Sequence, residues 1–438
     1  MDQKFLAGVG RAIITPPIGT ILHGYAPGRP AESVADDLTV TAVAVESETA
    51  AAILLSVTVC SIGNDTADRL RKLIGDATGI PADHVLVSPT HTHSGPNTSK
   101  SSGWGMVNQP YIDNTLIPCS VKAAQEAWKS RRGARLGIGT TFSEVGINRR
   151  EIRANGTIVL GQNPWGPYDP VMTVLSFKGD DGEIIANIIH YCAHCTGSGC
   201  NPEITRDWAG PMIDRLEEQS GGITGFYNGA EGDIGPRIAN GGSTGTLKLA
   251  YELGGRAALD AVRAWRSIHD WRKVEVAAIT DDIHIPYNPL PSRAEAQAEI
   301  DKIGDLDLWP DNYKKYAAVN ELMKWRGVIA EHDSSEPVKT HYVLRQTIIA
   351  IGPAAFVPFP FEMFVEITLR IRKDSPYQHT LCLSNTNGSV SYFPTQDQLC
   401  RGGYEIWAFK AGNVYSMVDD ADTFAVQENL RLIKALHS

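Results

Sequence analysis

Alternating apolar and polar positions predict strands in the first ninety residues. Residues 38–46 alternate with a period of two, and residues 52–59 form a second, more continuous apolar run after a short polar turn. This pattern is typical of two paired β-strands. A helix is expected over 65–74, where acidic residues come first and basic ones later, with Asn64 as its N-cap. A third strand, 84–89, follows, so this part of the chain is predicted to be β-β-α-β.

Each of four predicted strands leads into a cluster of polar or chemically reactive residues. The strands are 84–89, 183–190, 223–227 and 347–358, and the clusters are His91 to Pro96, His190 to Cys200, Asn228 to Pro236 and Phe359 to Met363. In α/β proteins, ligands bind where strands end and loops begin. We therefore expect one composite site that is assembled from most of the length of the chain.

The spacing of apolar residues predicts helices elsewhere, at 207–219, 247–265, 312–329, 362–372 and 426–435. Strands and helices alternate, which favours an α/β fold of mixed β-sheets flanked by helices. No repeat, low-complexity tract or linker divides the sequence, so residues 1–438 are expected to form a single domain. The charged, helical stretch 289–335 is the best candidate for an insertion or lid.

Composition narrows the classes of function. The 438 residues include 40 Lys and Arg against 50 Asp and Glu, a net charge of −10, with 42% hydrophobic residues. Such a chain is globular, and without a run of basic residues it offers no surface for nucleic acid. The longest apolar run, 50–59, is too short to span a membrane. With no signal peptide and an odd count of seven cysteines, we expect a cytoplasmic protein that acts on a small molecule without stable membrane association. The sequence leaves open whether it forms a homo-oligomer.

Two histidine clusters could hold a metal. His91 and His93 lie two residues apart before a Gly-Pro turn, which suits one metal ligand and one neighbouring acid, base or substrate donor, although ordinary loop histidines are the alternative. The second cluster offers a choice between a cysteine-rich zinc site, formed by Cys192, Cys195 and Cys200, and His194 as a catalytic ligand. The other cysteines occur singly, so we favour His194.

Several short motifs occur in an order that resembles the neutral (non-lysosomal) ceramidase family. They are His91-Thr-His-Ser-Gly-Pro96, Asn148-Arg149, Tyr191-Cys-Ala-His194 with Asp207-Trp-Ala-Gly210, Asn228 to Pro236, Pro360-Phe-Glu362, and Tyr392-Phe-Pro-Thr395 with Tyr404-Glu405. The resemblance extends from Gly8 to about residue 410. Members of this family are zinc amidases that split ceramide into sphingosine and a fatty acid.

The resemblance implies roles for individual residues. The zinc (Zn²⁺) ligands would be His91, His194, Glu362 and Tyr392. The residues that handle the substrate carbonyl and the proton would be His93, Arg149 and Tyr404. Asp233, in the glycine-rich loop, is a further catalytic candidate, with the capping of a turn or helix as the alternative. Two imidazoles and a carboxylate are a common catalytic zinc set, which leaves a position for water.

The sequence departs from the family at one important place. Where the ceramidases carry a serine in the pattern Gly-Asp-x-Ser-Pro, this chain has Gly235. The chain also ends soon after the last motif, so no C-terminal immunoglobulin-like domain is expected. The charged neighbours Glu231 and Arg237 suit a polar substrate better than a lipid.

We therefore expect a zinc-dependent hydrolase that cleaves an amide bond of a small polar molecule by metal-activated water. In this hypothesis His93 shuttles the proton, and Arg149 with Tyr404 holds the oxyanion. Two alternatives remain open. One is a metal-dependent hydrolase or lyase acting on a glycosidic, ester or lactone bond, with Glu231, Asp233 and Asp207 for acid-base work. The other is a relative that binds a ligand without turnover.

Overall fold

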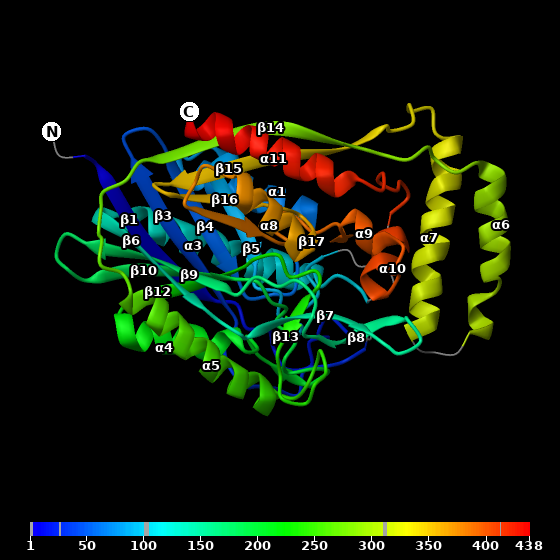
Figure 1. The fold of residues 1–438 in the computed structure, drawn as a ribbon, viewed down its shortest axis with the longest axis horizontal. Coiled ribbons are helices and arrows are strands. Elements are labelled where there is room, and N and C mark those ends of the chain that lie inside the picture. The colour runs from blue at the N-terminus through cyan, green and yellow to red at the C-terminus, as the bar shows by residue number, and fades with distance from the viewer. Residues whose placement is uncertain (1–2, 26–27, 100–104, 310–312, 412) are drawn as a thin grey trace.

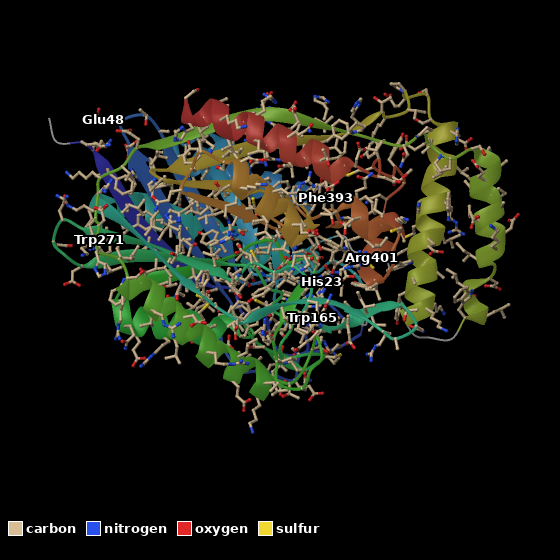
Figure 2. The ribbon with its side chains drawn as sticks, in the orientation of Figure 1. His23, Glu48, Trp165, Trp271, Phe393 and Arg401 are labelled. Atoms are coloured by element: carbon tan, nitrogen blue, oxygen red, sulfur yellow. The ribbon has the colours of Figure 1, made fainter. Side chains whose placement is uncertain are left out.

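The computed structural model describes residues 3–25, 28–99, 105–309, 313–411 and 413–438, and Figure 1 shows their arrangement. The described residues include an eight-stranded sheet with the order β12-β10-β9-β6-β1-β3-β4-β5. Its strands are β1 (Phe5–Ile13), β3 (Thr39–Ser47), β4 (Ala51–Val57), β5 (Val85–Pro89), β6 (Arg132–Phe142), β9 (Val171–Gly179), β10 (Ile184–Tyr191) and β12 (Ile223–Asn228).

A second, four-stranded sheet has the order β14-β15-β16-β18. Its strands are β14 (Val276–Pro286), β15 (His341–Ile351), β16 (Ala354–Pro358) and β18 (His379–Leu383). Three small sheets complete the strands: β7 (Gly146–Ile152) with β8 (Ile158–Asn163) and β13 (Ile234–Pro236), β17 (Glu362–Met363) with β19 (Tyr392–Phe393), and β2 (Ser33–Val34) with β11 (Glu203–Ile204).

The helices cover the outer faces of the two large sheets. The longer ones are α1 (Asn64–Thr78), α3 (Ile117–Lys129), α4 (Ala209–Ser220), α5 (Leu247–Arg266), α6 (Arg293–Ile303), α7 (Tyr313–Asp333), α8 (Val365–Asp374), α10 (Tyr404–Ala411) and α11 (Ala421–His437). Shorter turns are α2 (Gln109–Tyr111), the π-turn Ile112–Leu116 and α9 (Gln396–Leu399). Helices α1 and α3 pack on β1 to β5, α4 and α5 on β6 to β12, and α8 and α11 on the second sheet. The predicted class, mixed β-sheets flanked by helices, is confirmed.

A shared apolar core joins the two large sheets. Alternate residues of β3, such as Val43 and Val45, face Ile349 and Phe356 of the second sheet, while Val40 and Ala42 face the helices. Because both faces are covered, β3 is buried along most of its length. The large sheet also curls, since β1 and β6 pair at only two positions.

The curl brings the two edges of the large sheet together. The hydroxyl of Ser56 on β4 donates to the carbonyl of Phe226 on β12 at 2.6 Å, and the Tyr227 hydroxyl donates to the Leu54 carbonyl at 2.8 Å. The parallel pairs β4/β5, β10/β12 and β16/β18 therefore end in the same region (Figure 1). The loops that follow these strands carry the predicted polar clusters, as expected from the sequence.

Three details differ from the sequence-based expectation. Asn64 is the first residue of α1 and does not cap it; its side-chain oxygen accepts instead from the Ser389 amide at 2.9 Å. Residues 347–358 turn at Gly352 and form two antiparallel strands, β15 and β16. The helix expected over 362–372 begins only at Val365, because Glu362 lies in the short strand β17.

Helices α6 and α7 form a hairpin between β14 and β15, which are paired in register along their whole length. Figure 1 shows this hairpin beside α10, away from the large sheets. The described parts of 289–335 are thus largely helical and lie between two paired strands; that this stretch is an insertion or a lid stays a prediction. None of the described helices is long and apolar enough to cross a membrane.

Candidate metal centre

His91 follows β5 and has a backbone conformation that few residues adopt. Its φ of 66° lies in the left-handed region. The turn directs the imidazole inward, where Nδ1 lies 2.8 Å from the Cys60 carbonyl oxygen. A carbonyl can only accept, so Nδ1 carries the hydrogen and Nε2 presents its lone pair. Burial lowers the pKa of His91 and favours this neutral form.

His194 is held in the same tautomer by different partners. Its Nδ1 donates to the Glu231 carbonyl at 2.6 Å and lies 3.2 Å from that of Ile234. The Trp208 indole donates to the His194 carbonyl at 2.8 Å and fixes the backbone. Burial and the nearby Arg149 charge lower the pKa of His194 to about 3. Its Nε2 is therefore a second neutral nitrogen donor.

Glu362, in the short strand β17 that follows β16 of the second sheet, completes the cluster. Its Oε2 lies 3.0 Å from His194 Nε2 and 3.7 Å from His91 Nε2. Burial raises the pKa of Glu362, but the imidazoles of His91 and His194 and the Arg149 charge outweigh this effect and hold it at about 2. The carboxylate is thus ionised at neutral pH.

These three side chains fit a metal ion. One donor atom from each of His91, His194 and Glu362 lies within 4.8 Å of the others. Both nitrogens have the correct tautomer, and each Nδ1 is bound to a backbone carbonyl, an arrangement common among metal-binding histidines. In a second group, Cys60 with His91 and His93, the donor atoms also lie within 4.8 Å of one another. It fits less well, because burial raises the pKa of the Cys60 thiol and His91 Nδ1 is already used.

Tyr392 lies beside Glu362 because β17 and β19 pair in parallel, with Glu362 opposite Tyr392. Arg149 donates from its terminal nitrogen to the Tyr392 hydroxyl at 2.9 Å and from Nε to Glu405 at 2.9 Å. Arg150 donates to the other Glu405 oxygen at 2.7 Å. This buried network fixes the Tyr392 hydroxyl next to the cluster.

His93 and Tyr404 also reach the site. His93 Nε2 lies 3.1 Å from His91 Nε2, and burial together with the neighbouring imidazoles lowers the pKa of His93 well below its usual value. The Tyr404 ring meets that of Tyr392 edge to face, with centroids 5.7 Å apart. Burial raises the pKa of Tyr404, so its hydroxyl stays protonated.

A cavity of about 190 Å³ opens over the cluster. His91, His93, Glu362, Tyr392 and Tyr404 line it, while His194 lies just beneath with no exposed surface. This volume is below the roughly 300–1,000 Å³ of clefts that bind drug-sized ligands. The cavity therefore suits a small molecule.

Two predicted catalytic residues do not line this cavity. Arg149 is adjacent to the cluster, but its guanidinium contacts Tyr392 and Glu405, so it positions other groups. Asp233 accepts from the Val365 amide at 2.8 Å, at the start of α8, and from the Asn148 side chain at 3.0 Å. Its carboxylate faces a separate pocket. Asp233 thus lies against the first turn of α8 and outside the cavity, and its catalytic role stays a prediction.

The charged groups around the glycine-rich loop also turn away from the cavity. Glu231 is fully buried and accepts from the side chains of Asn228 and, at 2.8 Å, Asn385. Arg237 lies over the Tyr168 ring at 5.5 Å. A Cβ at Gly235 would come within 3.2 Å of the Arg149 Cβ. Glu231 and Arg237 therefore give no information about substrate polarity, contrary to expectation.

The cysteine cluster is not formed. Cys192 and Cys195 are buried and Cys200 is exposed. Among the described residues, these three do not come together as a group that could hold a metal. The preference for His194 over the cysteines agrees with this arrangement.

Sequence reasoning missed several neighbours of the site. His23 lines the cavity, and Asn385 Nδ2 lies 3.1 Å from His91 Nδ1. Glu405 belongs to one of the motifs but was not predicted as a site residue, although its carboxylate forms ion pairs with both Arg149 and Arg150. The position of Asn385 directly after a strand was a usable signal, whereas His23 has no periodic or motif context.

Comparisons with known proteins support the fold. No family model and no curated protein sequence matches this chain. Among solved structures, it is similar to the neutral ceramidase from Pseudomonas aeruginosa, with a TM-score of 0.75 and 18% identity, over 100% of this chain and 75% of that one. A ceramidase described as complexed with C2 gives a TM-score of 0.75 and 18% identity, over 100% of this chain and 76% of that one. The chain therefore has a neutral-ceramidase-like fold.

Proposed function

We propose that this protein is a zinc-dependent hydrolase that cleaves an amide bond of a small polar molecule. The observation that carries the proposal is the convergence of His91, His194 and Glu362 beneath a small cavity, with matched imidazole tautomers. The neutral-ceramidase-like fold is consistent with it. Zinc is favoured because two nitrogen donors and one carboxylate are typical of catalytic zinc sites.

In this proposal His91, His194, Glu362 and Tyr392 hold the ion. When bound, zinc supplies a Lewis acid for the substrate carbonyl and acidifies water to a pKa of about 7. The chain itself supplies the ionised Glu362 carboxylate and two neutral nitrogens, so no proton has to leave these three side chains. Arg149 keeps the Tyr392 hydroxyl turned toward the site.

His93 and Tyr404 are suited to opposite tasks. His93 is neutral and lines the cavity, so it can take up a proton and pass it to the leaving amine. Tyr404 stays protonated at neutral pH, so its hydroxyl can donate to the carbonyl oxygen as negative charge develops there. The overall reaction adds water across the C–N bond and yields a carboxylic acid and an amine.

The metal content of the purified protein tests this proposal. We expect close to one zinc per chain in protein never exposed to chelator, and a loss of most of it in His194→Ala, because removing one donor weakens a site of this kind strongly. The control is His269→Ala, at an exposed position, which should keep the wild-type content. A wild-type content below about 0.2 metal ions per chain would contradict the proposal, since catalytic sites usually retain their metal.

The other two hypotheses receive less support. Glycosidic cleavage generally needs a pair of carboxyl groups at the bond, yet among the described lining residues Glu362 is the sole acid. Asp207 and Glu231 have no exposed surface. Binding without turnover would be favoured by a panel of amides, esters and lactones that all bind and none of which is hydrolysed.

A further inference from the structure

The walls of the cavity above the cluster differ in chemistry. One side is aromatic, formed by Tyr392, Tyr404 and Trp407. Another carries hydroxyl groups, from Ser61 and Ser99 with Ser389 and Ser391. His23 and Asn320 add an imidazole and an amide. Such walls offer flat apolar faces on one side and hydrogen-bonding groups on the other.

The walls are also nearly uncharged. Apart from Glu362, the described residues that line the cavity include no aspartate, glutamate, lysine or arginine. A substrate with its own carboxylate or ammonium group would find no charged partner there, and burying an unpaired charge is costly. The apolar aliphatic lining is small, with Val390, Ala408 and Ala411. A long acyl or sphingoid chain would therefore not be accommodated within about 190 Å³.

One wall group lacks a protein partner and accepts hydrogen bonds. The Asn320 Oδ1 atom is buried, and no described residue donates to it. A buried acceptor without a partner is unfavourable, so a ligand that supplies a hydroxyl or amide hydrogen there gains affinity. Ser391 donates to the Ala408 carbonyl at 3.2 Å, which leaves its own oxygen free to accept. Ser61 and Ser99 share one hydrogen bond of 2.6 Å, so one of their two hydrogens remains for a ligand.

Trp407 is held with its polar edge turned away. Its indole Nε1 donates to Glu321 of α7 at 3.2 Å, and its ring is tilted by 32° against that of Tyr404. With the N–H used by Glu321, the part of Trp407 that lines the cavity is the apolar ring. The electron-rich faces of aromatic rings attract polarised C–H groups, and the C–H faces of a pyranose ring are of this kind.

We propose that the substrate is a small, neutral N-acylated amino sugar. This inference rests on the proposed function. The amide lies toward the His91 and Glu362 side, the sugar ring packs against Trp407, and its hydroxyl groups bond to Asn320 and the serines. Water adds across the C–N bond: the acyl carbon gains the oxygen and leaves as a carboxylate, and the nitrogen gains a proton and leaves as an amino sugar.

Three amides test the substrate class on the zinc-loaded protein. They are N-acetylglucosamine, which is neutral and hydroxylated, N-acetylglycine, which carries a carboxylate, and N-acyl sphingosine in mixed micelles. We expect hydrolysis of the first at a kcat/KM at least tenfold above the other two. Preference for N-acetylglycine or the lipid would overturn the inference while leaving the proposed hydrolase intact. Hydrolysis of none of them, by protein that retains its zinc, would also overturn the inference, whereas the proposed hydrolase is contradicted separately by a metal content below about 0.2 ions per chain.

Two variants test the assigned walls. Asn320→Ala should raise KM for N-acetylglucosamine about 5- to 20-fold with kcat within about twofold, because a binding hydrogen bond is lost. Trp407→Ala should raise KM similarly, and Trp407→Phe should restore part of the affinity, because it keeps an aromatic face. Asn240→Ala, at an exposed position, serves as the matched control with unchanged KM. Equal kinetics for Asn320→Ala and Asn240→Ala would contradict the role of Asn320.

Binding can be measured without turnover. The variant His194→Ala lacks a proposed metal ligand but keeps the described walls of the cavity. Calorimetric titration should show that it binds N-acetylglucosamine. The affinity should fall when Asn320→Ala is added in a double variant. An affinity unaffected by Asn320→Ala would overturn the inference.

Discussion

Residues with unusual backbone angles gather around the candidate metal site. His91, Asp207 and Asn385 have φ values of 66°, 58° and 50°, in the left-handed region that non-glycine residues seldom occupy. Such conformations cost about 1–3 kcal/mol each, and hydrogen bonds offset the cost. The Asp207 carboxylate accepts from the amides of Gly197, Ser198 and Trp208 and from the Ser198 hydroxyl. Asp207 thereby holds the backbone of Trp208, whose indole donates to the His194 carbonyl.

Asp233 should make stability depend on pH. Burial raises its pKa to about 7, against about 3.9 in an unfolded chain. Between these values the folded state binds the proton more tightly, so this contribution to stability is complete below about pH 4 and is lost as pH rises through about 7. Asp233→Asn removes the titrating carboxyl group. The new amide, however, can place an N–H donor opposite the Asn148 side chain, which itself donates to Asp233.

We therefore expect the Tm difference between Asp233→Asn and wild type to shift in favour of the variant as the pH rises from 5 to 8. Thermal unfolding at each pH measures this difference. Asp374→Asn, at an exposed position, serves as the control. A constant difference between Asp233→Asn and wild type across this range would show that Asp233 is not protonated in the folded protein.

At the scale of elements, the α6–α7 hairpin is attached mainly through α10. Besides the bond from Trp407 to Glu321, Lys324 donates to the Lys410 carbonyl at 2.6 Å, and the Tyr415 hydroxyl donates to Glu331 at 2.8 Å. The hairpin also supplies Asn320 to the cavity. In our proposal the hairpin therefore contributes to substrate binding but supplies none of the metal ligands.

Replacing residues 289–338 with a short Gly-containing turn tests this separation. The ends of β14 and β15 are already paired at Pro286 and His341, so the strands should still join. We expect unchanged zinc content and a KM raised about tenfold or more through loss of the Asn320 bond and the Trp407 support. Lys302→Ala, at an exposed position of α6, is the control. Loss of zinc together with substrate affinity would mean that the hairpin supports the whole site.

Sequence patterns predicted which strands would end at the site but not how they meet. The loops with His91 and His194 were found because each follows a strongly apolar run. The curl of the sheet depends on the two-position joint between β1 and β6 and on contacts such as Ser56 with Phe226, which leave no periodic signal. For the same reason the sequence did not predict the contact of Asp233 with Val365: a motif gives a residue's neighbours in the chain, and this contact is a long-range one.

At the scale of the whole molecule, the proposed ligands come from both large sheets and their connections. His91 and His194 follow strands of the eight-stranded sheet, whereas Glu362 follows a strand of the other. An ion bound by all three links the sheets, and a ligand that binds only the folded state stabilises it by about 2.7 kcal/mol at 100 times its dissociation constant.

Chelation should therefore lower the Tm by a few degrees, as measured by calorimetry with and without EDTA. Returning zinc should restore the original value. The Tm of His194→Ala should respond to neither treatment. A wild-type Tm that is insensitive to chelator, despite measured removal of the metal, would mean that the side chains alone hold the two sheets together at the site.

The in-register pairing of β14 with β15 has a consequence for how proteins of this fold could diversify. The entropy of closing a loop grows only with the logarithm of its length, by about 0.6 kcal/mol per doubling. A chain can therefore gain, lose or exchange the segment between Pro286 and His341 with little effect on folding. Evolution could alter the substrate through this segment alone, while the metal ligands stay under separate selection.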